Sequence, residues 1–204
     1  MATKKKEADP GKKPAISYWS KEKCVCPICK KAFEHEIMRS GNGRMIAGSL
    51  TEELHRNFEP SAKYGRVYPL IYEVGACPFC YSAFFWNDFT EKITSDDGDK
   101  IFEHSDRRKK ACEAIFPYFN LKKERSLLDG TAMYYLALMT YDDMGAYALP
   151  TMKKAIIALR LAWLTKEMNQ HCAGHNYDVV SKLFYSKALF FYQQAVENEQ
   201  NRTE

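Results

Sequence analysis

The second half of the chain carries a hydrophobic pattern that is typical of packed helices. In residues 124–141, for example, Leu128, Ala132 and Tyr135 form one apolar stripe, and a second apolar stripe runs beside it. The two stretches that follow are also apolar on more than one face, so other elements have to cover them. Antiparallel helices joined by short loops provide such cover. Four helices are predicted, at about 100–115, 124–141, 151–168 and 175–199.

Weak internal similarity indicates that these helices form a repeat array. The run Leu136-Ala137-Leu138-Met139-Thr140 resembles the run Leu161-Ala162-Trp163-Leu164-Thr165. Ala188, Tyr192 and Ala195 also follow the small–aromatic–small spacing of a tetratricopeptide helix. The full repeat signature is absent from the sequence, so an ordinary helical bundle is an equally good interpretation. We expect a tetratricopeptide-like antiparallel helix array, with the bundle as its alternative.

The first half of the chain has shorter apolar runs, which favour strands. Two strands are predicted at 32–39 and 44–47, on either side of the turn signal Gly41-Asn42-Gly43. A third strand is predicted at 66–76, because this run is rich in β-branched and aromatic residues. Residues 51–61 are compatible with either a short helix or a loop.

These patterns predict an α+β fold whose character changes near residue 95. The polar cluster Ser95-Asp96-Asp97-Gly98-Asp99 marks a turn and a helix start. The strands before it form a small β lobe, and the chain after it is mainly α-helical. The expected divisions are a disordered basic tail at 1–15, a knuckle lobe at 16–95 and a helical domain at 96–204.

Positive charge is concentrated at the N-terminus. The 204 residues carry a formal net charge of +4, and residues 1–14 hold five Lys against Glu7 and Asp9. The rest of the chain is therefore nearly neutral, which argues against nucleic-acid binding by bulk charge. We expect the tail to be a solvated extension that aids solubility.

Hydropathy and cysteine content indicate the compartment. The longest apolar stretch, 155–164, contains Arg160 and is much shorter than the about 20 residues of a membrane span. No apolar block follows the N-terminal lysines, so no secretory signal is expected. Both features predict a cytoplasmic protein. In a reducing cytoplasm, the seven Cys are expected to be metal ligands or buried thiols rather than disulfides.

Two matched motifs, Cys26-Pro27-Ile28-Cys29 and Cys77-Pro78-Phe79-Cys80, carry the strongest chemical signal. Two residues between cysteines let both sulfurs turn toward one point, and nearby backbone N–H groups stabilise the thiolates. Two such knuckles supply the four sulfurs that a tetrahedral zinc ion needs at about 2.3 Å each. We therefore predict one structural zinc ion, with the ligands Cys26, Cys29, Cys77 and Cys80.

The knuckles leave three questions open. They are 47 residues apart, so the insert between them needs strands or a helix of its own. Four thiolates also suit iron, and a Cys-Pro-x-Cys motif also serves thiol–disulfide exchange, although that chemistry needs only one copy. Cys24, two positions before Cys26, is either a substitute ligand or a spare thiol. Cys112 is expected to be a buried apolar residue.

Two helix ends carry residues with a possible chemical role, and a structural interpretation is preferred for both. His171, Cys172 and His175 have a spacing that suits a metal, but they fall where a helix should end. The pair Asp142-Asp143 also lies at a predicted helix end, and we expect it to form a solvated turn.

A basic run and an aromatic cluster also admit two interpretations. Arg107-Arg108-Lys109-Lys110 can contact phosphates, but its acidic neighbours favour a solvated helix face with i,i+4 ion pairs. The aromatic cluster can stack on bases, but packing of the β lobe against the helices is the more common role. Its members are Phe84, Phe85, Trp86 and Phe89. The sequence contains no Gly-rich phosphate loop, nucleophile elbow or His-Glu-x-x-His motif, so no catalytic site is predicted.

Several of these motifs occur together in a recognisable order. The matching residues are Cys26-Pro27-Ile28-Cys29 with Phe33, Arg39, Tyr68-Pro69-Leu70-Ile71-Tyr72-Glu73-Val74, Cys77-Pro78-Phe79-Cys80-Tyr81-Ser82-Ala83, Leu136-Ala137 and Leu161-Ala162-Trp163. In this order they resemble a bacterial family of unknown function in which two Cys-Pro-x-Cys knuckles precede tetratricopeptide-like helices. The resemblance spans about residues 20–200. It implies a zinc-ribbon-like lobe on a helical-repeat scaffold, and it implies no activity.

The chain departs from the family pattern in both knuckles. Family knuckles usually have Gly after the second Cys, whereas this chain has Lys30 and Tyr81. A non-Gly residue in a left-handed conformation costs about 1 kcal/mol, so we expect these two loops to be slightly strained.

Three function hypotheses follow. The first and preferred one is a non-enzymatic protein-interaction adaptor of the bacterial cytoplasm, with zinc as a structural element and another protein bound by the helical domain. The second is a nucleic-acid or ribosome-associated module that uses the metal lobe, the Lys-rich tail and Arg107-Arg108-Lys109-Lys110. The third is a thiol-redox or metal-assisted enzyme.

Overall fold

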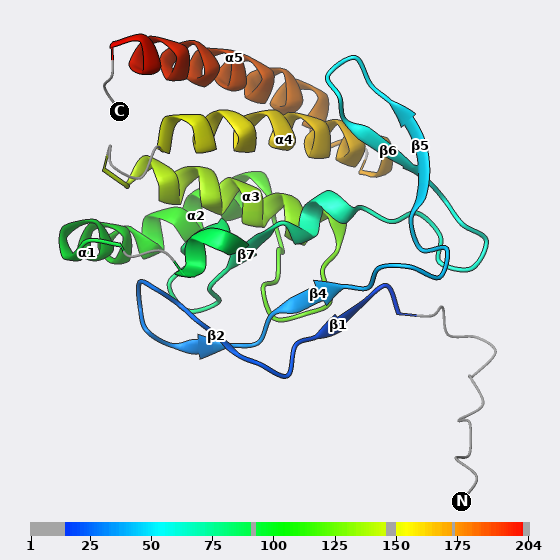
Figure 1. Ribbon diagram of the computed structural model, residues 1–204, viewed down its shortest axis with the longest axis horizontal. Coiled ribbons are helices and arrows are strands. Elements are labelled where there is room, and N and C mark those ends of the chain that lie inside the picture. The colour runs from blue at the N-terminus through cyan, green and yellow to red at the C-terminus, as the bar shows by residue number, and fades with distance from the viewer. Residues whose placement is uncertain (1–14, 91–92, 146–149, 173, 202–204) are drawn as a thin grey trace, which may run out of the picture.

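Several short strands lie along one face of a layer of helices, and one strand pair lies beside the ends of the last two long helices (Figure 1). The computed structural model describes residues 15–90, 93–145, 150–172 and 174–201. The predicted α+β class is confirmed, since paired strands precede the helices along the chain. Of the basic tail predicted at 1–15, residues 1–14 lie outside the described ranges.

The strands of the described residues form four two-stranded antiparallel sheets. One of these sheets has its two strands on either side of the first cysteine motif, and another has its two strands on either side of the second motif. With two to five residues each, the strands are too short for any one sheet to be stable alone. The pairs are β1 (Ser17–Trp19) with β4 (Glu36–Met38), β2 (Cys24–Val25) with β3 (Ala32–Phe33), β5 (Ile46–Leu50) with β6 (Arg56–Glu59), and β7 (Val74–Ala76) with β8 (Ala83–Phe85).

Three strand predictions need correction. The stretch 32–39 is divided into β3 and β4, which pair with different partners. The strand predicted at 44–47 begins at Ile46, and its partner β6 comes from the ambiguous stretch 51–61. In 66–76 only β7 is extended, because Pro69 begins a 3-10 helix, η1 (Pro69–Tyr72). Proline has no N–H for a strand ladder, and its fixed φ suits the first turn of a helix.

Within the described ranges, five α-helices follow the strands. The 3-10 helix η2 (Trp86–Thr90) precedes them. The last three helices confirm the predicted stretches to within a few residues, since the hydrophobic period marks long helices well. They are α1 (Ser95–Glu103), α2 (Ser105–Ile115), α3 (Leu127–Asp142), α4 (Pro150–His171) and α5 (Tyr177–Asn201).

The single helix predicted at 100–115 is wrong, because the structure has α1 and α2 there. The first begins at Ser95, where Thr94 caps it by accepting a hydrogen bond from the Asp97 amide. The helix is interrupted at His104, whose φ of −80° and ψ of 9° lie outside the helical region. The His104 ring contacts Asp143 at 2.9 Å, so a tertiary contact accompanies the break.

The start of α3 is set by a capping box rather than by the hydrophobic pattern. The Asp129 amide donates to the Ser126 hydroxyl over 3.2 Å, and the Ser126 amide donates to the Asp129 carboxylate over 3.1 Å. These bonds satisfy two backbone N–H groups that a helix start leaves open. The helix therefore begins at Leu127, three residues later than the pattern predicts.

The helices α3, α4 and α5 pack in chain order, each against the next (Figure 1). The Ser181 hydroxyl of α5 donates to the Ala162 carbonyl of α4 over 2.8 Å, which fixes the two helices at a small-residue contact. This order agrees with an antiparallel array. Whether the array is a tetratricopeptide-like repeat, and whether the strands form a zinc ribbon, stay predictions.

One hydrophobic core joins the strands to the helices. It includes Val74 and Phe84 from the strands and Tyr134 and Leu161 from the helices, all four of them fully buried. Two glycines permit the close approach of these parts. A side chain at Gly75 would overlap the Trp86 ring, and one at Gly130 would overlap the Ile71 side chain. The division into a lobe at 16–95 and a domain at 96–204 stays a prediction.

Substitution of Gly130 tests this close packing. In Gly130→Ala, the new methyl group overlaps Ile71, so we expect the free energy of unfolding to fall by about 1–3 kcal/mol. Gly98→Ala is the matched control, because Gly98 is also helical and no atom outside its chain neighbours and its own helix backbone lies within 4 Å of the point where its methyl group would be. There the change should raise stability by up to about 1 kcal/mol. Urea unfolding measures both, and equal shifts would contradict the account.

Candidate metal centre

The two cysteine motifs form loops with the same backbone hydrogen bonds. In the first, the Cys26 amide donates to the Lys31 carbonyl and the Lys30 amide donates to the Cys26 carbonyl, both over 3.0 Å. In the second, the Cys77 amide donates to the Ser82 carbonyl over 2.8 Å and the Tyr81 amide to the Cys77 carbonyl over 3.0 Å. Each loop therefore turns both of its cysteines toward one side.

The residue after each motif has a left-handed backbone, with φ of 59° at Lys30 and 55° at Tyr81. This is the position where the family resemblance places glycine. A side chain in this conformation costs about 1 kcal/mol, so each loop is held by its surroundings rather than by local preference.

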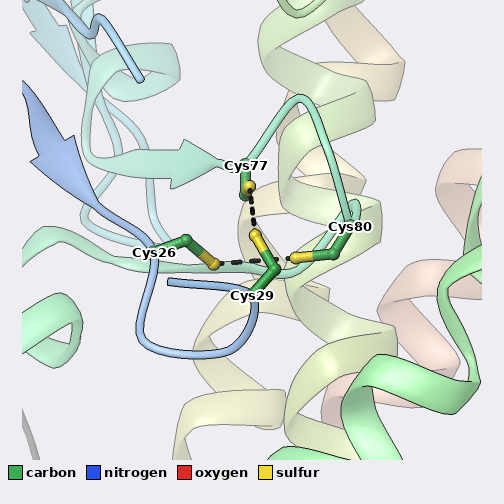
Figure 2. A group of neighbouring side chains, drawn as sticks. All are labelled: Cys26, Cys29, Cys77 and Cys80. Carbon is green, nitrogen blue, oxygen red and sulfur yellow. Dashed lines mark hydrogen bonds between the residues drawn. The ribbon is translucent and has the colours of Figure 1, made fainter. Parts of the chain in front are cut away.

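The four sulfur atoms of Cys26, Cys29, Cys77 and Cys80 meet between the loops (Figure 2). The Cys26 sulfur lies 3.6 Å from the Cys80 sulfur, and the Cys29 sulfur lies 3.6 Å from the Cys77 sulfur. All four sulfur atoms lie within 4.8 Å of one another. Four sulfurs at about 2.3 Å from a tetrahedral zinc lie about 3.8 Å apart. The site thus has the number, type and spacing of donors that a metal ion of this kind requires.

Burial makes this cluster sensitive to charge. Cys26, Cys77 and Cys80 are buried, and only Cys29 is partly exposed. The Cys77 and Cys80 thiols lower the pKa of Cys26 by hydrogen bonding, and the Cys26 side chain in turn raises the pKa of Cys80 to about 11. Several thiolates cannot be buried together without protons or a cation to offset their charge. Such a cluster binds either protons or a metal ion.

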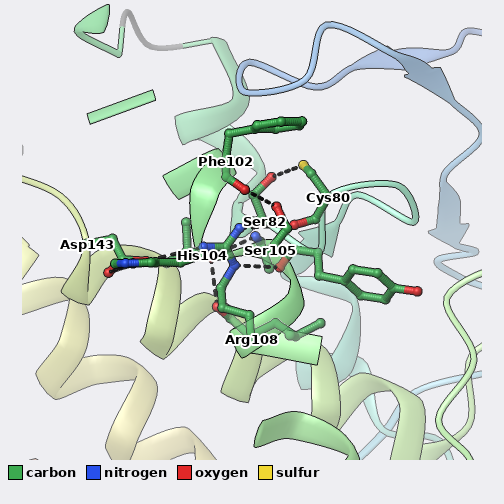
Figure 3. Close-up of polar contacts among 11 residues, drawn as sticks. Cys80, Ser82, Phe102, His104, Ser105, Arg108 and Asp143 are labelled. Carbon is green, nitrogen blue, oxygen red and sulfur yellow. Dashed lines mark hydrogen bonds and ion pairs between the residues drawn. The ribbon is translucent and has the colours of Figure 1, made fainter. Parts of the chain in front are cut away.

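Ser82 and Arg108 support the cluster from outside. The Ser82 hydroxyl lies 3.1 Å from the Cys80 sulfur and 3.4 Å from the Cys26 sulfur. The guanidinium of Arg108, a residue of α2, donates to the Cys80 carbonyl over 3.0 Å and to the Tyr81 carbonyl over 3.3 Å (Figure 3). A helix side chain therefore holds the backbone of the second knuckle.

The basic run that contains Arg108 is not wholly a solvated face, which corrects the sequence prediction. Arg108 is fully buried, and its guanidinium pairs with the Asp143 carboxylate at 3.2 Å. Burial lowers the pKa of Arg108, while Asp143 and the nearby thiolates raise it. The prediction of i,i+4 pairing is confirmed for Lys109 and Glu113, whose charged atoms lie 4.0 Å apart.

Asp143 also differs from its predicted role as part of a solvated turn. Its carboxylate is almost buried and contacts both Arg108 and the His104 ring (Figure 3). Asp142 is exposed and pairs with Lys154 at 3.1 Å. The pair at the end of α3 thus divides into one surface carboxylate and one that links α1, α2 and α3 beside the knuckle.

The remaining candidates lie outside the cluster. Among the described residues, the four cysteines are the only group of three or more His, Cys, Asp or Glu side chains close enough to share a metal ion. Cys24 is partly buried on β2 and is not a member. Cys112 is fully buried, and its thiol donates to the Ala132 carbonyl, as expected for an apolar core position. His171 contacts the Tyr68 hydroxyl at 3.1 Å, at the end of α4.

The aromatic cluster after the second knuckle packs in the core, as predicted. Phe84 is fully buried and Phe89 nearly so, and their rings meet edge to face at 5.4 Å. Phe84 also contacts Tyr141 of α3 at 5.8 Å. These rings join the knuckle to the helices.

Comparison with known proteins identifies the family. Residues 19–204 match the family described as "Uncharacterized protein conserved in bacteria (DUF2225)", and the chain belongs to this family. It is 34% identical over 190 residues to an uncharacterized protein of Borreliella burgdorferi, an alignment that covers 93% of this chain and 67% of the relative. No solved structure matches the chain. The predicted membership of an uncharacterised bacterial family is confirmed, whereas shared knuckles and repeat helices across that family stay a prediction.

Within the described ranges, none of the helices is both long enough and apolar enough to cross a membrane.

Arg108→Ala tests the link between α2 and the second knuckle. The change leaves Asp143 and two carbonyl oxygens buried without their cation, so we expect the free energy of unfolding to fall by about 3–5 kcal/mol. Arg107→Ala is the matched control, since this neighbour is exposed, and its effect should stay within about 0.5 kcal/mol. Urea unfolding of both proteins measures the difference, and similar losses would refute the link.

Proposed function

We propose that Cys26, Cys29, Cys77 and Cys80 bind one zinc ion whose role is structural. Four thiolates complete a tetrahedral shell, so no coordination position is left for a substrate or water. The burial of three of the four sulfurs supports the same role, because a structural site needs no access. The observation that carries this proposal is the convergence of the four sulfurs from two loops 47 residues apart.

On this basis we propose that the protein is a non-enzymatic interaction adaptor and that another protein binds its helical part. The support is the outer face of α5. Val179, Leu183 and Phe190 lie along one face of this helix and are 50%, 59% and 56% exposed. Apolar side chains in a row on a helix surface are what a partner helix or peptide covers.

Two features bear on the compartment and on the alternatives. None of the seven cysteines forms a disulfide, which supports our proposal that the protein acts in the bacterial cytoplasm. A thiol-redox enzyme would require a reactive, accessible thiolate, and a saturated four-sulfur site offers none. The nucleic-acid-binding alternative uses the metal lobe and the run Arg107-Arg108-Lys109-Lys110, whereas the adaptor proposal uses the outer face of α5.

Loss of one ligand tests the zinc proposal. We expect the purified protein to hold one zinc ion per chain, and Cys26→Ser and Cys80→Ser to lose it, because a serine hydroxyl is not ionised at neutral pH. Both variants should also melt at a much lower temperature, since the metal joins segments whose own strands are short. Elemental analysis and circular dichroism provide the two readouts.

Cys24→Ser is the matched control for this experiment. Cys24 lies beside the first knuckle, but its sulfur is outside the cluster, so the variant should keep its zinc. Unchanged metal content and stability in both ligand variants would refute the zinc proposal. Iron in place of zinc would correct the metal and leave the ligand set intact.

The adaptor proposal is tested on the full chain, because one core joins both halves. We expect affinity capture from the bacterium's own cells to recover a defined protein with the wild type and to lose it with Leu183→Gln and Phe190→Gln. Both positions are exposed, so folding should be unaffected. Lys182→Gln and Lys187→Gln, exposed on the same helix, are the controls. A partner that all variants recover equally would argue against this face.

A further inference from the structure

Three lysines from separate segments surround two aromatic rings of the second knuckle. The Lys31 and Lys122 amines lie 5.1 and 5.8 Å from the centre of the Phe79 ring. The Lys109 amine lies 5.6 Å from the centre of the Tyr81 ring. One lysine follows the first knuckle, one belongs to α2 and one to the loop before α3. We call these five residues the knuckle surface.

The knuckle surface borders a hollow that contains a further aromatic residue. Phe79 is 45% exposed, although Cys80 follows it directly in the loop. A cavity of about 260 Å³ lies beside the loop, and its lining includes Tyr81, Phe119, Lys109, Lys122 and the carboxylate residue Glu113. The Tyr81 and Phe119 rings meet edge to face at 6.4 Å. Two aromatic rings, two amines and one carboxylate therefore border one concave space.

Tyr118, one residue before Phe119, carries an unusually exposed ring. Its side chain is 97% exposed, and its backbone is left-handed with φ of 67°. A large aromatic residue gains nothing in stability from such a position. Exposed rings of this kind serve as contact surfaces for planar ligands.

The charge of the knuckle surface is positive. Within the described chain, neither Lys31 nor Lys122 lies at ion-pair distance from a carboxylate, and Lys109 pairs only loosely with Glu113 at 4.0 Å. The exposed side chains of Lys30 and Lys123 adjoin two of these lysines in sequence. A local excess of amines can attract a polyanion even though the body of the protein is nearly neutral.

We propose that the knuckle surface binds single-stranded nucleic acid. Amines beside aromatic rings match the phosphates and bases of such a strand, because amines pair with phosphates while rings stack on unpaired bases. An acidic protein segment would use the amines and leave the rings without a role. None of the five residues belongs to α5, and α5 and β2 lie on opposite sides of the helical layer (Figure 1), so this binding goes beyond the proposed adaptor role.

The test uses the full, metal-containing protein and fluorescently labelled strands of about 12 nucleotides, poly(U) RNA and poly(dT) DNA, followed by fluorescence anisotropy. We expect the triple variant K31Q/K109Q/K122Q to bind at least about ten-fold more weakly than the wild type. The slope of log affinity against log salt should fall by about 2, since each lost phosphate contact contributes about 0.7. Comparing the two strands tells RNA preference from DNA preference.

The control K166Q/K182Q/K187Q removes the same charge from exposed positions on α4 and α5 and should bind like the wild type. Phe79→Ala and Tyr118→Ala should each weaken binding by about five-fold or more through lost stacking. Tyr118 has almost no packing contact, so its variant remains informative even if Phe79→Ala disturbs the loop.

Three results would overturn the proposal. The first is no binding by the wild type at low salt, and the second is equal binding by the two triple variants. The third is equal competition by polyglutamate of the same charge, with no loss in the aromatic variants, which would assign the surface to an acidic protein segment. Metal content and circular dichroism of each variant confirm that the compared proteins are folded.

Discussion

Four thiols within 4.8 Å of one another, three of them buried, cannot all ionise unless a cation lies among them. The β half of the molecule depends on how that charge is balanced. Its strands have two to five residues and form four separate sheets, so backbone pairing alone cannot hold them. A structural zinc ion contributes about 10–16 kcal/mol in small zinc-dependent peptides, which exceeds the whole stability of many domains. In our account, the metal is what makes this arrangement of short strands stable.

The cysteine cluster is also connected to the helices, through buried polar groups rather than through apolar packing alone. Arg108 reaches from α2 to two carbonyls of the second knuckle, and Asp143 at the end of α3 holds its guanidinium. Arg125, just before α3, donates to the Val74 carbonyl over 2.8 Å, and its own amide donates to the Glu36 carboxylate over 2.8 Å. Each contact has a direction, so these links fix how the strands sit on the helices.

The grouping of the four cysteines could be predicted from the sequence, whereas the residues that support it could not. The predicted ligand set rests on local signals, because a Cys-Pro-x-Cys loop brings its own two sulfurs together. The burial of Arg108 depends on Asp143, 35 residues away, and on carbonyls 28 and 27 residues away, so nothing in the basic run distinguishes it from its neighbours. Ser82 lies only two residues after Cys80 in the sequence, so its hydroxyl was the one supporting group that the sequence could have indicated.

The same contrast applies to the fold. The long helices α3, α4 and α5 follow a period that many residues repeat, so their positions were predictable to within a few residues. Strands of two or three residues carry too few positions for such a pattern, and their partners are chosen by distant contacts. This is why 32–39 became two strands, and why the stretch 51–61 supplied β6. The break at His104 is equally non-local, because it accompanies the contact with Asp143.

X-ray absorption spectroscopy of the purified protein tests the central claim most directly, because it reports which atoms surround the metal and at what distance. The account predicts a zinc edge and a single shell of four sulfur atoms at about 2.3 Å, with no nitrogen or oxygen neighbour. A shell with fewer sulfurs, or sulfurs bonded to each other with no metal between them, would contradict it.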